Sequence, residues 1–323
     1  MGWRAGGAED EEGSPNETRE GVCGSVEDII MFVAGMRKFV CRGFKRTRME
    51  DSIVSLATQH VLSHFRRVPR VQPMFVALQG PQGSGKTYLT RSLVSTLSSP
   101  PHSLRLAVLS VDDLYLPHSG LRKLATDNPG NKLWNGRGQP GTHDVELGAY
   151  ILRRLQDINA EPDGVLDATA RPQLVLPSFD KSKYGGEGDR AAVGTPVKPP
   201  IDIFILEGWS IGFYPLAQPD LDKMWMDVIN NAAAAPGSLI HRAMEGIRKG
   251  HIEAVNHALR DYVREWYGFF EVFIQVSATF ISMYLLSLSE LCSLFCNNTK
   301  IRSPTHSPHE YIYTVGKETC QMS

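Results

Sequence analysis

The chain alternates between short, continuous apolar runs and longer segments in which apolar residues recur with a helical period. Three apolar runs have the length and continuity of buried strands, at residues 74–79, 104–111 and 201–206. Three periodic segments are spaced as amphipathic helices, at residues 50–66, 87–97 and 145–155. Strands that alternate with helices predict an α/β fold, a doubly wound parallel sheet with helices on both faces.

The same pattern divides the chain into three parts. Residues 1–48 form an N-terminal extension that we expect to be partly disordered, because its first half is rich in Gly, Glu, Asp and Ser and has little to bury. Its second half is a basic amphipathic stretch, which we interpret as a solvated appendage rather than a contact for a membrane or an acidic partner. Residues 49–276 hold the predicted domain, and residues 277–323 form an atypical C-terminal tail.

A glycine-rich loop directly follows the first predicted strand. It reads Gly80-Pro81-Gln82-Gly83-Ser84-Gly85-Lys86-Thr87 and fits G-x-x-x-x-G-K-[ST] at every position, between a strand and a helix. In such a loop the backbone N–H groups turn toward a phosphate at the start of a helix. Lys86 is then expected to reach the β- and γ-phosphates, and the Thr87 hydroxyl to bind Mg²⁺. The sequence therefore predicts a P-loop NTPase fold that binds ATP with Mg²⁺.

Carboxylates stand at the ends of the two other predicted strands. Because the carboxyl ends of parallel strands face the ligand crevice, we expect Glu207 to hold Mg²⁺ directly or through water. Asp112 is the candidate base that accepts a proton from a hydroxyl acceptor. Adjacent residues do not both face the crevice, so Asp113 is the second candidate for the base. The alternative to a catalytic role is that these aspartates cap the turn that follows them.

Composition and charge narrow the partners. The chain has 323 residues and a net charge of −1, which gives no support to a nucleic acid as the main partner. Its five scattered cysteines are typical of reduced thiols in an intracellular protein. The apolar run at 276–296 is interrupted by serines and Glu290, so we expect no stable membrane insertion and a cytoplasmic protein. The oligomeric state is not fixed by the sequence.

Three further segments are too polar and glycine-rich for a core and too irregular for disorder, at residues 127–144, 176–190 and 206–215. The most distinctive strings are Arg137-Gly138-Gln139-Pro140-Gly141-Thr142-His143-Asp144 and Asp180-Lys181-Ser182-Lys183-Tyr184-Gly185-Gly186-Glu187-Gly188-Asp189-Arg190. Together with the phosphate loop and Asp112-Asp113-Leu114-Tyr115, they resemble the D-glycerate 3-kinase family of plants, cyanobacteria and fungi. Phosphoribulokinase, uridine kinase and pantothenate kinase are wider relatives. The resemblance covers roughly residues 50–276.

The resemblance implies a kinase that transfers phosphate from ATP to a small hydroxyl acceptor, with D-glycerate as the best single candidate. It gives Asp112 the position of the relatives' catalytic aspartate and directs the two distinctive loops toward the acceptor. The residues that it implies for acceptor binding are Arg137, His143, Asp144, Asp180, Lys181, Lys183, Tyr184 and Arg190. A guanidinium could clamp the glycerate carboxylate, although ion pairs between the loops would produce the same sequence. Another small metabolite as acceptor, or ATP binding without transfer, are the alternatives.

The chain departs from the family pattern at its end. After the strand-like residues 273–276, the family continues with a helix that carries a Trp-Arg pair and a stretch rich in Gln and Glu. Residues 277–301 of this chain contain neither Trp nor Arg. We hypothesise that residues 277–323 are an altered terminus that lacks the lid arginine of the family, which would leave the chain weakly active or unstable.

Overall fold

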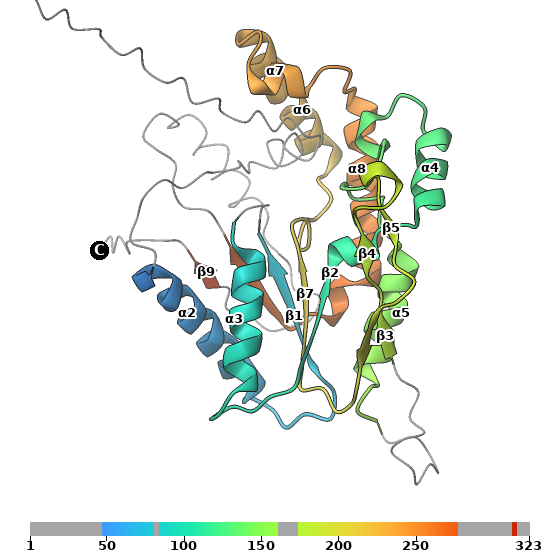
Figure 1. Cartoon of the computed structure of the whole chain (residues 1–323). Helices are drawn as coiled ribbons and strands as arrows, with labels where there is room; N and C mark the ends of the chain where they lie inside the picture. The colour runs from blue at the N-terminus through green and yellow to red at the C-terminus, as the bar shows by residue number, and fades with distance from the viewer. Residues whose placement is uncertain (1–46, 81–83, 161–173, 277–311, 315–323) are drawn as a thin grey trace, which may run out of the picture.

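The computed structural model describes residues 47–80, 84–160, 174–276 and 312–314. At its centre is a five-stranded sheet in the order β2-β7-β1-β8-β9, and all neighbouring strands in it are parallel (Figure 1). Almost all of the N-terminal extension and most of the apolar run at 276–296 lie outside the described residues. Across the described part of the chain, no helix combines the length and the apolar character needed to cross a bilayer.

The strands of the central sheet follow the apolar runs closely. Their bounds are β1 Met74–Gln79, β2 Leu106–Ser110, β7 Ile203–Gly208, β8 Val272–Val276 and β9 Ile312–Thr314. Every residue of β1 is buried, which explains its unbroken apolar run. The second strand is shorter than predicted, because the chain turns into the 3₁₀ helix η1, Val111–Leu114. The third begins and ends two residues later than predicted, so that Glu207 lies within it.

Helices cover both faces of the sheet, as the periodic segments predict. Helices α2, Thr47–Phe65, and α3, Lys86–Ser98, lie on one side, and α5, Val145–Gln156, and α8, Lys249–Glu265, lie on the other (Figure 1). Alternate residues of β1 enter the two cores: Val76 packs with α2 and α3, whereas Ala77 packs with α5 and α8. This confirms the doubly wound α/β fold.

The segments predicted as irregular contain small elements of their own. Two antiparallel pairs link β3, Leu174–Leu176, to β6, Thr195–Val197, and β4, Phe179–Asp180, to β5, Asp189–Arg190. The remaining helical elements are α4 His118–Asp127, η2 Lys132–Trp134, η4 Tyr184–Gly186, α6 Gln218–Ala234, α7 Leu239–Ala243 and η5 Tyr267–Phe269. A separate apolar cluster joins α6 to α8 and η2. Among them, β4 contacts the 3₁₀ helix η1, which directly follows the carboxyl end of β2, where the predicted site lies.

Candidate active site

The phosphate loop leaves the buried strand β1 and enters helix α3. A side chain at Gly80 would place its Cβ 2.7 Å from Ser84 Oγ and 2.9 Å from the Val276 carbonyl oxygen, so only glycine fits this close turn. Gly85 caps α3 with a φ of +91°, a conformation that favours glycine. Lys86 then begins the helix and Thr87 is exposed beside it. Pro81, Gln82 and Gly83 lie outside the described residues.

Lys86 and two strand-end carboxylates lie close enough to influence one another. Burial lowers the pKa of Lys86, while the negative charges of Glu207 and Asp112 oppose that shift. Burial raises the pKa of Glu207, and the Lys86 ammonium opposes it. The sheet order explains the meeting: β7 lies between β1 and β2, so Glu207 is next to Leu78 on one side and Ser110 on the other. The expected convergence of these groups is therefore present.

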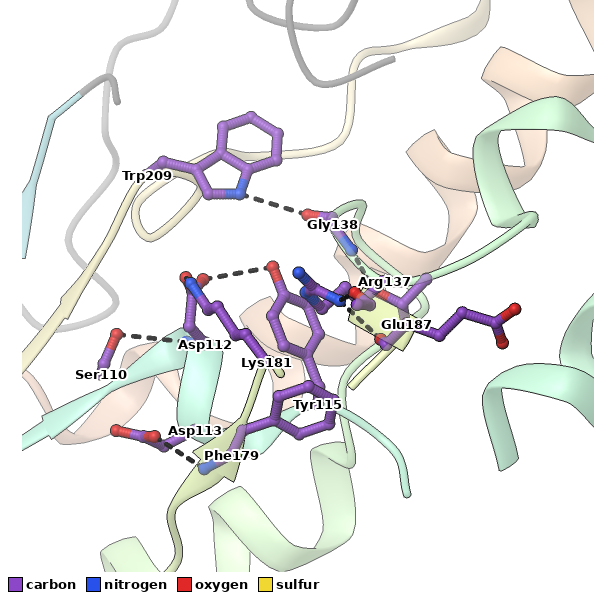
Figure 2. A network of polar contacts seen from close by, with 12 residues as sticks. Ser110, Asp112, Asp113, Tyr115, Arg137, Gly138, Phe179, Lys181, Glu187 and Trp209 are labelled. Carbon is purple, nitrogen blue, oxygen red and sulfur yellow. Dashed lines mark hydrogen bonds and ion pairs between the residues drawn. The ribbon is translucent and has the colours of Figure 1, made fainter. Parts of the chain in front are cut away.

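Two side chains, Lys181 and Tyr115, hydrogen-bond the carboxylate of Asp112. Lys181 Nζ lies 2.5 Å from Asp112 Oδ2, and the Tyr115 hydroxyl donates to Oδ1 at 3.2 Å (Figure 2). The backbone N–H of Asp112 donates to Ser110 Oγ at 3.3 Å. Burial raises the pKa of Asp112, but the hydrogen bond and charge of Lys181 outweigh it and hold that pKa below its usual value. The carboxyl is therefore an ionised carboxylate at neutral pH.

Asp113 has a different position from its neighbour. Its carboxylate is turned away from that of Asp112 and accepts the Phe179 backbone N–H at 3.0 Å (Figure 2). Burial raises the pKa of Asp113. This contact fixes the start of β4, two residues before Lys181, so Asp113 anchors that loop. Its role as the second candidate base stays a prediction.

The first distinctive loop contributes one residue to the neighbourhood of Asp112. The His143 ring is 3% exposed and stacks on Tyr115 with ring centroids 4.3 Å apart. Arg137 instead donates from one nitrogen to the carbonyls of Gly186 and Glu187, at 2.5 Å each. In this structure Arg137 bridges the two loops, and acceptor binding by Arg137 stays a prediction.

Asp144 and Arg190 also hold the loops together. Asp144 caps helix α5 by accepting the Leu147 N–H at 3.0 Å, and its other oxygen pairs with Arg190 at 3.0 Å. Arg190 further donates to the Tyr115 carbonyl at 3.0 Å. For this pair the structure shows the alternative that the sequence left open, an ion pair between loops.

The remaining predicted acceptor residues make contacts within the second loop or at the surface. Asp180 accepts from the backbone and the hydroxyl of Ser182, and Lys183 donates to the Arg190 carbonyl at 3.2 Å. Tyr184 is 60% exposed and stacks on His118 with centroids 3.8 Å apart. Acceptor binding by these three residues stays a prediction.

Comparisons with known proteins give the family to which the chain belongs. No family model matches the chain. The chain is 34% identical to the solved structure of D-glycerate 3-kinase from Cryptococcus neoformans var. grubii, with a TM-score of 0.58; the match covers 69% of this chain and 72% of that one. The chain belongs to the D-glycerate 3-kinase family.

Curated relatives of this D-glycerate 3-kinase family member are named as kinases. This chain is 41% identical over 147 residues to the probable ATP-dependent kinase TDA10 of Saccharomyces cerevisiae, a match that covers 45% of this chain and 48% of the relative. It is 35% identical over 156 residues to the chloroplastic D-glycerate 3-kinase of Arabidopsis thaliana, covering 48% of this chain and 32% of the relative. The chain thus matches half or less of the length of these two relatives. The resemblance predicted from its motifs is confirmed.

The residues present fit a magnesium ion shared with a nucleotide. Glu207 Oε2 is buried and has no hydrogen-bond partner within the described part of the chain. A carboxylate oxygen of this kind is a ligand that Mg²⁺ prefers. The described residues contain no group of three His, Cys, Asp or Glu that could enclose a metal alone. Since Mg²⁺ in phosphoryl-transfer sites is commonly bound by one or two protein groups plus phosphates, Glu207 and Thr87 suit that arrangement.

Two aromatic residues contact the site but were not predicted as site residues from the sequence. Tyr115 follows Asp112 by three positions, a spacing that could have suggested the contact within one turn. Tyr262 reaches His143 from helix α8, with 119 residues between them, and its hydroxyl lies 2.5 Å from His143 Nδ1. Its helical periodicity signals burial only, so no sequence signal could have found this contact.

Proposed function

We propose that this chain phosphorylates a small hydroxyl acceptor with ATP, and that the acceptor is D-glycerate. The observation that supports this function best is the cluster of Lys86, Glu207 and Asp112, which combines a phosphate-loop cation with an ionised carboxylate at the crevice. The names of the relatives support both the kinase chemistry and glycerate as the acceptor.

In the proposed reaction the phosphate loop binds the triphosphate of ATP, and Lys86 offsets charge on the transferring phosphoryl group. Glu207 and Thr87 would hold Mg²⁺, which supplies further neutralisation of phosphate charge when bound. The acceptor hydroxyl oxygen forms a bond to the γ-phosphorus while the bond from that phosphorus to the β,γ-bridging oxygen breaks. Asp112 accepts the hydroxyl proton, and ADP leaves with the bridging oxygen.

Asp112 keeps the capacity to take that proton although two groups contact it. A carboxylate offers about four lone-pair positions, of which Tyr115 and Lys181 occupy one each. The Lys181 side chain is 53% exposed beside the carboxylate, so an incoming anionic group can share its ammonium. This cation is our candidate for recognising the glycerate carboxylate.

The test is ADP release by the full chain with ATP, Mg²⁺ and a panel of acceptors. We expect D-glycerate to stimulate turnover above L-glycerate, glycerol, pantothenate and uridine, and Lys86→Ala to abolish the stimulation. Stimulation by a different acceptor would reject glycerate and keep the kinase. ATP binding without stimulation by any acceptor would reject transfer and favour a nucleotide-binding role, as the altered terminus hypothesised for residues 277–323 would predict.

A further inference from the structure

The His143 imidazole is held on two sides by aromatic residues. Tyr115 stacks on its face at 4.3 Å with an interplanar angle of 22°. The Tyr262 hydroxyl lies 2.5 Å from Nδ1 at its edge. His143 is 3% exposed and Tyr262 is fully buried, so the ring has one orientation and little access to bulk water.

The hydrogen bonds of Tyr262 determine which imidazole nitrogen carries the proton. Its hydroxyl oxygen accepts the Gly141 backbone N–H at 3.3 Å. Among the residues that the structure describes, His143 Nδ1 is the one acceptor recorded within reach of the hydroxyl proton. Burial also raises the pKa of Tyr262 well above its usual value, which keeps the phenol protonated. The hydroxyl therefore donates to Nδ1, and Nδ1 must be the unprotonated nitrogen.

Burial lowers the pKa of His143 to about 4, so the ring is neutral near pH 7. A neutral imidazole with an unprotonated Nδ1 carries its hydrogen on Nε2. That nitrogen is buried and has no hydrogen-bond partner in the described part of the chain. A buried donor without a partner is unfavourable, so such a group pairs either with an ordered water or, in a functional site, with a ligand.

We propose that Tyr262 is a positioning residue that fixes His143 as the Nε2–H tautomer, and that Nε2–H donates to an oxygen of the acceptor substrate beside Asp112. The location supports the acceptor as the partner. His143 lies close enough to Asp112 that a charge on its ring would act on that carboxylate, and the Tyr115 ring on which it stacks donates its hydroxyl to the same carboxylate. Only the identity of the acceptor rests on the proposed function; the tautomer rests on the contacts and burial of His143 and Tyr262.

A neutral donor suits this position chemically. Asp112 already has the Lys181 ammonium at 2.5 Å, and Lys86 is a second nearby cation. An imidazolium would add a third positive charge and lower the basicity of Asp112 further. The neutral Nε2–H orients an acceptor oxygen without that cost, and the oxygen belongs either to the carboxylate or to a hydroxyl of the acceptor.

The first test is ¹H–¹⁵N correlation NMR of the full chain labelled in histidine, with the His143 signals assigned by their loss in His143→Gln. We expect an unprotonated Nδ1 and a protonated Nε2. Tyr262→Phe should abolish this single-tautomer pattern. Tyr267→Phe is the matched control, because Tyr267 is also buried and its hydroxyl contacts only backbone groups of Gly212, Phe213 and Ser210. A proton on Nδ1, or an unchanged pattern in Tyr262→Phe, overturns the assignment.

The second test adds ligands in the presence of Mg²⁺ and ADP, with binding followed by calorimetry. D-glycerate should shift the His143 Nε2–H signal; an equal shift with glycerol assigns the contact to a hydroxyl, and a shift with D-glycerate alone assigns it to the carboxylate. Bound glycerate without a shift overturns the proposed contact. No binding of glycerate rejects the proposed acceptor, and the tautomer result still stands.

Kinetics then separate positioning from stability. For Tyr262→Phe we expect kcat/KM for glycerate to fall about five- to tenfold, the effect of one neutral hydrogen bond, with KM for ATP unchanged. Tyr267→Phe should change the melting temperature without this loss. If kcat/KM for glycerate fell equally in both variants, Tyr262 would contribute only to packing, and the proposal would be overturned.

Discussion

Replacing Asp112 by Asn tests the proposed base with little change of shape. The amide keeps an oxygen that can accept the Tyr115 hydroxyl, but it cannot take a proton from the acceptor. General base catalysis contributes about 10²- to 10⁴-fold to rate, or about 3–5 kcal/mol of activation free energy. We therefore expect kcat to fall by about that factor, while ATP affinity changes little because Lys86 and the phosphate loop are intact.

The fold should tolerate this change. The pair that is lost, Asp112 with Lys181, is partly exposed, with side-chain exposures of 28% and 53%. A pair of this kind is worth less than about 1 kcal/mol after solvent screening. For a domain of this size such a loss lowers the melting temperature by no more than about 2–4 °C. A large loss of turnover therefore cannot be assigned to unfolding at the assay temperature.

The assay is steady-state ADP release with D-glycerate, with nucleotide binding and thermal melting measured on the same preparations. Asp113→Asn is the matched control, since an amide oxygen there can still accept the Phe179 N–H. We expect Asp113→Asn to retain most of its turnover. Turnover of Asp112→Asn within about threefold of the unmodified chain, or an equal loss in both variants, would refute Asp112 as the base.

Three further predictions follow from the same contacts. Lys86→Ala should abolish turnover and weaken ATP binding in a nucleotide titration, with an unchanged melting profile; full activity would contradict the phosphate-loop assignment. Lys181→Met removes the charge that lowers the pKa of Asp112, so the acidic limb of the pH profile of kcat/KM should move to higher pH; an unmoved limb would contradict this coupling. Gly148→Ala should lower the free energy of unfolding by about 1–3 kcal/mol in urea titrations, because its Cβ would lie 2.6 Å from Trp266; an unchanged midpoint would contradict that packing.

The sequence by itself predicted the strands β1, β2 and β7, the helices α2, α3 and α5, and the glycine-rich loop between β1 and α3. Helix α8 and the order of the strands in the sheet came only from the structure. An unbroken apolar run such as 74–79 reports burial on both faces, and the phosphate loop is a local structure whose spacing is fixed by the backbone. Element ends were less well determined. The strand predicted at 104–111 ends before Val111, and the strand predicted at 201–206 continues past Leu206, because hydrogen bonding between neighbouring strands decides where a strand stops.

Only the tertiary structure decided which charged residue does what in the two loops. Arg137, Asp144 and Arg190 have the composition of a ligand site, but they join the loops to each other, whereas Lys181 reaches Asp112. A pattern along the chain reports which side chains are buried within an element. It contains no information on which of several cations meets a given carboxylate across 69 residues, since that depends on how the loops close over the sheet.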